Sequence, residues 1–80
     1  KGRNVDGALA MLLMEFATIY KSDKYNLPIT RKELAAIIGY SKESVINTLS
    51  AFNKDRIIEL KDKSVEILDK SRLELIIQAG

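Results

Sequence analysis

Cysteine, histidine and tryptophan are missing from this sequence, and proline occurs only once. The lack of cysteine excludes disulfide bonds, thiolate zinc sites and iron–sulfur ligation within the segment. The lack of histidine removes the most common general base and the most common metal ligand together. The remaining acidic and hydroxyl side chains offer no evident general base and no spacing typical of a metal site. We therefore expect no enzymatic activity and no metal or cofactor in this segment.

Long hydrophobic runs are also missing. The longest, Ala8–Met14, is far shorter than the roughly 20 apolar residues that a membrane-spanning helix needs. A secretory signal is not evident either. The expected compartment is therefore the cytoplasm, without membrane contact. With 80 residues and 46% hydrophobic content, the chain is expected to form one compact domain over residues 1–80.

The net charge of +2 is by itself a weak indication of nucleic-acid binding. Its distribution says slightly more. Residues 1–27 contain four basic and three acidic residues, residues 28–56 contain five and three, and residues 57–80 contain four and five. The small basic excess therefore lies in the middle of the chain.

Residues 30–52 carry the most informative pattern, which predicts two short helices joined by a glycine turn. Thr30 followed by Glu33 fits a capping box, and Ser41 starts a second helix two residues after Gly39. Gly39 supplies the backbone freedom of a tight turn. Apolar residues at helical spacing predict the inner faces, Leu34, Ile37 and Ile38 in the first helix and Val45, Leu49 and Phe52 in the second.

The second helix, about 42–54, also has a mixed outer face. Its members fall at helical spacings, and most of them are polar or charged: Lys42, Glu43, Ile46, Asn47, Ser50 and Lys54. A helix-turn-helix offers such a face to the major groove of DNA. The pattern therefore predicts a DNA-binding module.

Before this pair, Val5–Lys21 is predicted to be a helix of four to five turns. Its apolar stripe is expected to pack in the core, although part of it could face another domain or a second subunit: Val5, Leu9, Leu12, Leu13, Phe16, Ile19 and Tyr20. A polar loop is expected at Ser22–Asn26. The segment Leu27–Ile29 is expected to be extended, because proline lacks a donor and disfavours helix in the residue before it.

After the pair, two β-prone runs are predicted to form a hairpin. The strands are Ile57–Leu60 and Val65–Leu68, with the four residues 61–64 as the turn. Asp69 is expected to cap a last helix whose inner residues are Leu73, Ile76 and Ile77. A helix-turn-helix followed by a hairpin predicts a mainly α fold with a small β-hairpin, the winged helix-turn-helix.

The runs LPITRKELA (residues 27–35) and GYSKESV (residues 39–45) resemble the C-terminal domain of the Crp/Fnr family of bacterial transcription regulators. The resemblance extends over nearly the whole chain. It implies that the chain is the C-terminal fragment of a longer regulator, whose N-terminal sensor domain would bind an effector that this segment does not identify. It also implies a homodimer on a near-palindromic operator of double-stranded DNA, and contact with RNA polymerase.

The resemblance further implies which residues read bases. Glu43 stands on the family's base-reading Glu, and Lys42 stands where the family usually has Arg. Ile46 and Asn47 depart from the pattern, since many members have a small residue and then Arg. Asn prefers adenine where Arg prefers guanine, and Ile46 could pack on a thymine methyl group. We therefore expect a half-site shifted toward A·T at that position.

Seven further residues are predicted to contact DNA phosphates: Thr30, Arg31, Ser41, Ser50, Lys54, Lys61 and Lys63. Helix N-termini favour phosphate, although capping alone would explain Thr30 and Ser41. Lys61 and Lys63 lie in the predicted hairpin, which is called the wing, and could equally be ordinary solvated side chains at its tip. Arg56 stands where the family often has glycine, so it is predicted to strain the turn by about 1 kcal/mol if it takes a positive φ.

An alternative function is a winged-helix protein–protein interaction module without specific DNA binding. Such a module would be expected to have an apolar outer face on the second helix. Only Ile46 fits that expectation, while Lys42, Glu43, Asn47 and Ser50 do not.

Overall fold

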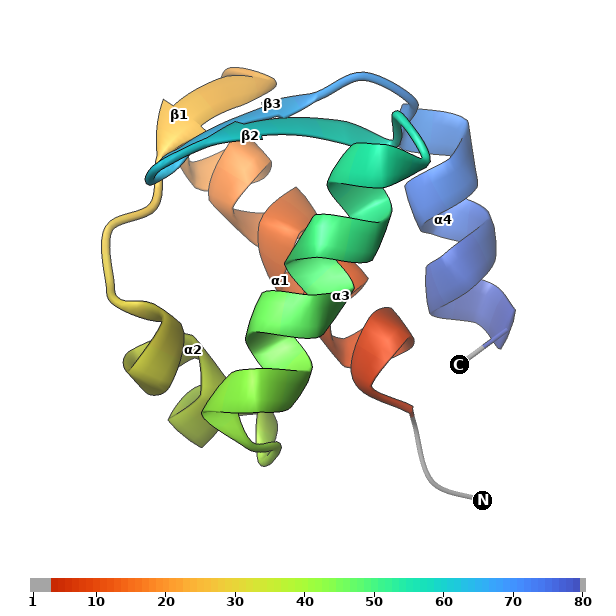
Figure 1. Cartoon of the computed structure of the whole chain (residues 1–80). Coiled ribbons are helices and arrows are strands. Elements are labelled where there is room, and N and C mark those ends of the chain that lie inside the picture. The colour runs from red at the N-terminus through yellow and green to blue at the C-terminus, as the bar shows by residue number, and fades with distance from the viewer. Residues whose placement is uncertain (1–3, 80) are drawn as a thin grey trace.

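The computed structural model describes residues 4–79, which form four helices and one three-stranded antiparallel sheet (Figure 1). A β-hairpin follows directly after two helices joined by a short turn. The winged helix-turn-helix predicted from the sequence is therefore confirmed. In chain order the elements are α1 (Val5–Tyr20), β1 (Lys24–Asn26), α2 (Arg31–Ile38), α3 (Lys42–Lys54), β2 (Ile58–Lys61), β3 (Ser64–Ile67) and α4 (Lys70–Ala79).

The helices begin at side chains that can cap them. Thr30 forms the predicted capping box, in which its hydroxyl accepts from the Glu33 N–H at 3.1 Å and the Glu33 carboxylate accepts from the Thr30 N–H at 2.8 Å. Ser41 and Asp69 each accept from the amide three residues later at 3.1 Å. Asn4 caps α1 in the same way. These caps satisfy amides that a helix leaves without an internal partner, so they set where each helix starts.

Gly39 closes the turn between α2 and α3. Its φ is +80°, and its N–H donates to the Ala35 carbonyl at 2.9 Å. This left-handed conformation is readily adopted by glycine and disfavoured for other residues. The turn that the sequence predicted is therefore present.

The sheet has the order β1-β3-β2, so β3 lies in the middle (Figure 1). The sequence analysis was wrong about β1, because it expected a loop over residues 22–26 and an extended segment over 27–29. The strand lies earlier because Tyr25 pairs with Val65 and is buried, with its hydroxyl donating to the Leu13 carbonyl at 2.7 Å. Pairing ends near Pro28, which has no N–H to donate.

The hairpin also differs from its prediction. Its turn contains two residues, Asp62 and Lys63, in place of the four expected, because Lys61 pairs directly with Ser64. Asp62 takes a φ of +54°, a conformation that aspartate tolerates better than most residues. The strands are accordingly shifted, to residues 58–61 and 64–67.

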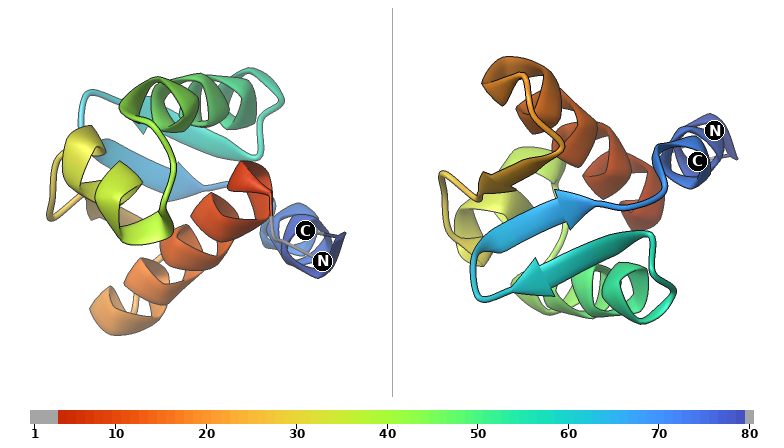
Figure 2. Two further views of the ribbon diagram at one scale, coloured as in Figure 1. Left: turned by 90° about the horizontal axis from the view of Figure 1, so that it is seen from below. Right: turned by 90° about the horizontal axis from the view of Figure 1, so that it is seen from above.

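The core is built around α1, which contacts all three of the other helices. The sheet lies over α1 and α3 from one side, while α4 packs beside the N-terminal half of α1 (Figure 2). The leucines that the helices contribute to the core are almost inaccessible to solvent: Leu9, Leu13, Leu34, Leu49 and Leu73. Ile76 and Ile77 pack against this core as expected.

Three apolar side chains predicted to face inward are exposed instead. Ile37 is 62% exposed and Ile19 is 70% exposed, while Tyr20 is half exposed and stacks on the Tyr25 ring at 5.6 Å. For α2 the reason is the direction of its buried face. Ala35 is buried and lies about 100° from Leu34 around the helix, whereas Ile37 lies about 60° to the other side. The buried side is centred between Leu34 and Ala35, so Ile37 is left at its edge.

Candidate nucleic-acid interface

The outer face of α3 carries the six side chains that the sequence placed there. All six are exposed: Lys42, Glu43, Ile46, Asn47, Ser50 and Lys54. The opposite face holds the buried residues Val45, Thr48, Leu49 and Phe52. The core therefore fixes the orientation of α3 and leaves the polar face accessible along the whole helix.

Two polar contacts hold α3 at its sides. The Thr48 hydroxyl donates to the Asp6 carboxylate of α1 at 3.4 Å, and the Asn53 side-chain oxygen accepts from the Leu60 N–H of β2 at 3.0 Å. Because these contacts reach α1 and the wing, α3 cannot rotate about its axis without breaking them. The outer face is thus presented in one direction.

A hollow of about 450 Å³ lies at the N-terminal ends of α2 and α3. It lies beside the wing turn, which is the two-residue turn Asp62–Lys63 of the hairpin. It brings together four of the predicted contact residues, Thr30, Arg31, Lys42 and Lys63, from three separate elements. Lys32 also lines it, and sequence reasoning missed this residue because nothing in its local pattern separates it from an ordinary surface lysine. Of the charged side chains around the hollow, four are basic and only Glu33 is acidic.

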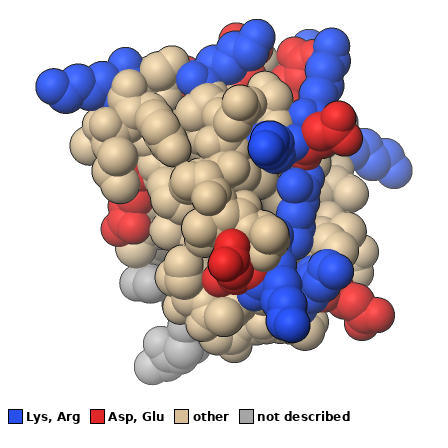
Figure 3. Space-filling view, turned by 90° about the vertical axis from the view of Figure 1, so that its left-hand side faces the viewer, with Lys and Arg blue, Asp and Glu red and all other residues tan. Residues whose placement is uncertain are grey.

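The positive character of this region is visible on the molecular surface. Seen from the side of α2 and the wing turn, basic side chains form a band down one side, with acidic side chains beside it and a broad area without charge next to it (Figure 3). Neighbouring cations held at fixed positions attract an extended anion such as a phosphate backbone. The geometry therefore suits a polyanion that runs past the start of α3.

The structure separates the two wing lysines. Lys63 lines the hollow, whereas Lys61 lies on the solvent face of the sheet with Glu59 and Glu66. The Lys61 ammonium is 3.9 Å from the Glu59 carboxylate, and its side chain is 81% exposed. Lys61 shares its hollow with two carboxylates and one other cation, whereas Lys63 shares its hollow with three other cations and one carboxylate, so Lys63 is better placed for an anion.

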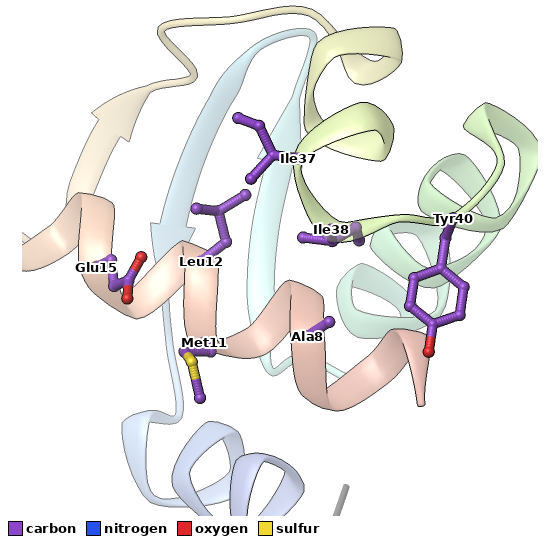
Figure 4. A pocket seen from close by; sticks show the side chains of 7 residues that line it. All are labelled: Ala8, Met11, Leu12, Glu15, Ile37, Ile38 and Tyr40. Carbon is purple, nitrogen blue, oxygen red and sulfur yellow. The ribbon is translucent and has the colours of Figure 1, made fainter. Parts of the chain in front are cut away.

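A second hollow, of about 300 Å³, lies between α1 and α2, and most of the residues that line it are apolar. Figure 4 shows Ile37 of α2 and Leu12 of α1 facing each other across it, with Glu15 at its rim. Exposed apolar surface of this kind is common at protein–protein contacts. It lies away from the outer face of α3, where Ile46 is 41% exposed among polar neighbours.

Other classes of site are not evident in the described part of the chain. Residues 4–79 contain no cluster of three or more potential metal ligands, and none of their helices is long and apolar enough to cross a membrane. The pKa of Tyr25 is raised well above its ordinary value, first because the phenol is buried and second because Tyr20 is close. This phenol lies beneath the sheet and belongs to the core.

Comparisons with known proteins agree with this arrangement. Residues 7–76 match the family model of the Crp-like helix-turn-helix domain. A structure described as a transcriptional regulator of the Crp/Fnr family, from Eubacterium rectale, is similar over 95% of this chain, with 25% identity and a TM-score of 0.84. The catabolite activator protein of Thermus thermophilus is similar over 92%, with 24% identity and a TM-score of 0.79. The chain spans about a third of the length of each, 34% in both cases. No curated protein sequence matches.

Proposed function

Because the chain belongs to the family of Crp-like helix-turn-helix domains, and is thus a DNA-binding domain of a transcription regulator, we propose that it recognises a specific sequence of double-stranded DNA. In this proposal α3 enters the major groove and its outer face contacts base edges. The observation that carries the proposal is the exposed polar face of α3 directly beside a hollow with four cations.

The proposed base contacts follow from side-chain chemistry. Glu43 accepts a hydrogen bond from a cytosine amino group, and Asn47 pairs with adenine through its amide. Ile46 cannot form a hydrogen bond, but it can pack on a thymine methyl group. Lys42 stands at the start of α3 and also lines the hollow, so it can contact either a base or a phosphate. These residue types favour A·T pairs near Ile46 and Asn47.

The proposed phosphate contacts set the position of α3 without carrying much sequence information. Thr30, Arg31 and Lys63 belong to the hollow, while Ser41 is exposed at the start of α3. Ser50 and Lys54 are exposed further along α3, and Lys61 is the weakest member because of its acidic neighbours. A phosphate backbone that crosses the hollow would be closer to the residues of the hollow than to Ser50 and Lys54.

The wider assembly is also part of the proposal. Since the chain is about a third as long as the similar chains, we propose a longer regulator with an N-terminal sensor domain. A homodimer would place one α3 in each half-site of a near-palindromic operator, and the bound dimer would contact RNA polymerase. Half-sites one helical turn apart would match such a two-fold arrangement.

Binding selection on randomised duplex DNA at physiological salt tests the proposal. We expect an enriched half-site with A·T pairs at the positions read by Ile46 and Asn47. In Asn47→Ala the preference at one position should disappear, whereas Gln78→Ala on α4 should select the same site as the unaltered chain. Strong enrichment of guanine at the Asn47 position would contradict the proposed contacts. Salt-dependent binding without any enrichment would contradict specific recognition.

A protein-interaction module is the second candidate, and the observation that favours it is the exposed Ile37 in the hollow between α1 and α2. Under that reading the chain would bind no DNA at physiological salt. A failure to bind any duplex would therefore support it, and Ile37→Ser would then be expected to disrupt the protein contact.

A further inference from the structure

The side chain of Arg31 makes a contact that links two distant parts of the fold. Arg31 is the first residue of α2, and one nitrogen of its guanidinium donates to the backbone carbonyl of Asp62 in the wing turn. The two residues are 31 positions apart in the chain. Arg31 as a whole residue is partly buried, and the hydrogen bond of its guanidinium to Asp62 is exposed to solvent. The start of the helix pair and the tip of the hairpin are therefore joined by a side chain.

A second contact holds the same turn. The Leu27 N–H donates to the Lys63 carbonyl at 2.7 Å. The carbonyl groups of both turn residues, Asp62 and Lys63, are thus held by the segment that leads into α2. The positive φ of Asp62 gives the turn a defined shape, and Lys63 lines the hollow beside Lys42.

We propose that Arg31 is a positioning residue that fixes the wing turn against the start of α2 and so places Lys63 beside Lys42 for contact with DNA. This proposal rests on the proposed function. Arg31 uses one of its five N–H donors for the Asp62 carbonyl, so the others remain able to meet a phosphate. Replacing Arg31 would then weaken DNA binding by more than the loss of one phosphate contact, because the contact made by Lys63 would be lost as well.

Arginine and lysine carry the same charge but differ in geometry, which separates positioning from simple attraction. The planar guanidinium can place separate nitrogens at the wing and at a phosphate, whereas the lysine side chain is one bond shorter and ends in a single nitrogen. A lysine ammonium at position 31 keeps the attraction to phosphate but lacks that planar fork. Arg31→Lys should therefore release the wing turn while preserving the charge of the hollow.

The first experiment examines the chain without DNA by NMR. The Lys63 amide reports on the contact, because it shares its peptide group with the Asp62 carbonyl. In Arg31→Lys we expect the resonance of the Lys63 amide to shift, while the resonances of the core amides stay in place. Lys32→Gln, which removes a cation from the same hollow, should leave the Lys63 amide unchanged. An unchanged Lys63 amide in Arg31→Lys would overturn the proposal whether or not the chain binds DNA.

The second experiment measures DNA affinity against salt concentration for Arg31→Lys, Lys63→Gln and the double variant. Loss of the Lys63 contact in Arg31→Lys should lower the slope of log affinity against log salt by about 0.9, although the charge is conserved. In a chain that already carries Arg31→Lys, the further change Lys63→Gln should weaken DNA binding little or not at all. Independent, multiplying effects would overturn the positioning role. If the unaltered full-length regulator binds no DNA, the proposed function fails, and the Lys63 amide alone then decides whether Arg31 holds the wing.

Discussion

Arg56 has a left-handed backbone conformation, with a φ of +61°, in the turn between α3 and β2. The sequence analysis identified this position as a source of strain, and the positive φ is confirmed. For an L-residue this conformation costs about 1–2 kcal/mol of folding free energy, which glycine avoids. Glycine also makes the unfolded chain more flexible, which offsets part of that gain. We expect Arg56→Gly to raise the free energy of unfolding by about 0.5–1 kcal/mol in urea titrations.

The matched control for this change is Arg56→Ala. It removes the same charge and side chain but keeps the Cβ atom that makes the conformation unfavourable. No comparable gain is expected from it. An equal gain in both variants would mean that the charge of Arg56, and not its backbone, destabilises the domain.

Tyr25 gives a prediction about alkaline pH. Burial, and secondarily Tyr20, raise the pKa of its phenol above the ordinary 10.0, so the folded state keeps this proton longer than the unfolded state. The contribution of the protonated Tyr25 phenol to the stability of the folded state is therefore complete below pH 10, and it is lost as the pH rises from 10 toward the pKa of the folded state. Tyr25→Phe should lower the free energy of unfolding by about 1 kcal/mol at neutral pH, because the hydrogen bond to the Leu13 carbonyl is lost.

Urea unfolding at several pH values below and above 10 measures both effects. The difference in stability between the unaltered chain and Tyr25→Phe should shrink above pH 10, since only the unaltered chain has this phenol to ionise. A constant difference across that range would show that ionisation of Tyr25 is not coupled to unfolding.

At the scale of elements, the helices were predictable because their signals are local. The capping box at Thr30 and Glu33 lies within four residues, and the caps at Ser41 and Asp69 bond to amides three positions away. The outer face of α3 was predictable for the same reason, since the helical period alone selects its members. Such features depend little on the rest of the chain.

The elements that were mispredicted depend on distant partners. β1 is a strand because Tyr25 meets Val65, and the wing turn is short because Lys61 meets Ser64. Neither pairing can be read from the residues near it. The hollow beside α3 is similar, since its walls come from α2, α3 and the wing turn, and the Arg31 contact with Asp62 spans 31 residues. The sequence could therefore predict α3 and its outer face but not the hollow next to it.

The outer face of α3 as an element gives a prediction about specificity. Glu43 is exposed in the first turn and accepts from a cytosine amino group in the proposed complex. Glu43→Ala should weaken binding to the selected site by about 1–3 kcal/mol and relax the choice of base at one position. Competition assays with selected and random duplexes measure both. Equal losses on the two duplexes would contradict a base-reading role for Glu43.

At the scale of the whole molecule, the number of phosphates that its cations neutralise sets how strongly salt controls DNA binding. If the four cations of the hollow each meet a phosphate, the slope of log affinity against log salt is about −3 to −4 for each copy of the domain on the DNA. Titrations at several salt concentrations give this slope directly. A much steeper slope would require cations outside the hollow, and Lys54 on α3 would be the next to test.

The position of β3 between β1 and β2 also has a consequence for synthesis on the ribosome. Tyr25 and Val65 are paired in the sheet but 40 positions apart in the chain. At about 5–20 residues per second, β1 emerges roughly 2–8 s before its partner is made. Both helices of the pair, α2 and α3, are made within that interval, while Tyr25 has no strand to join. The domain can therefore complete its core only after the wing has been translated. A translational pause within the wing would leave the earlier elements without a complete core.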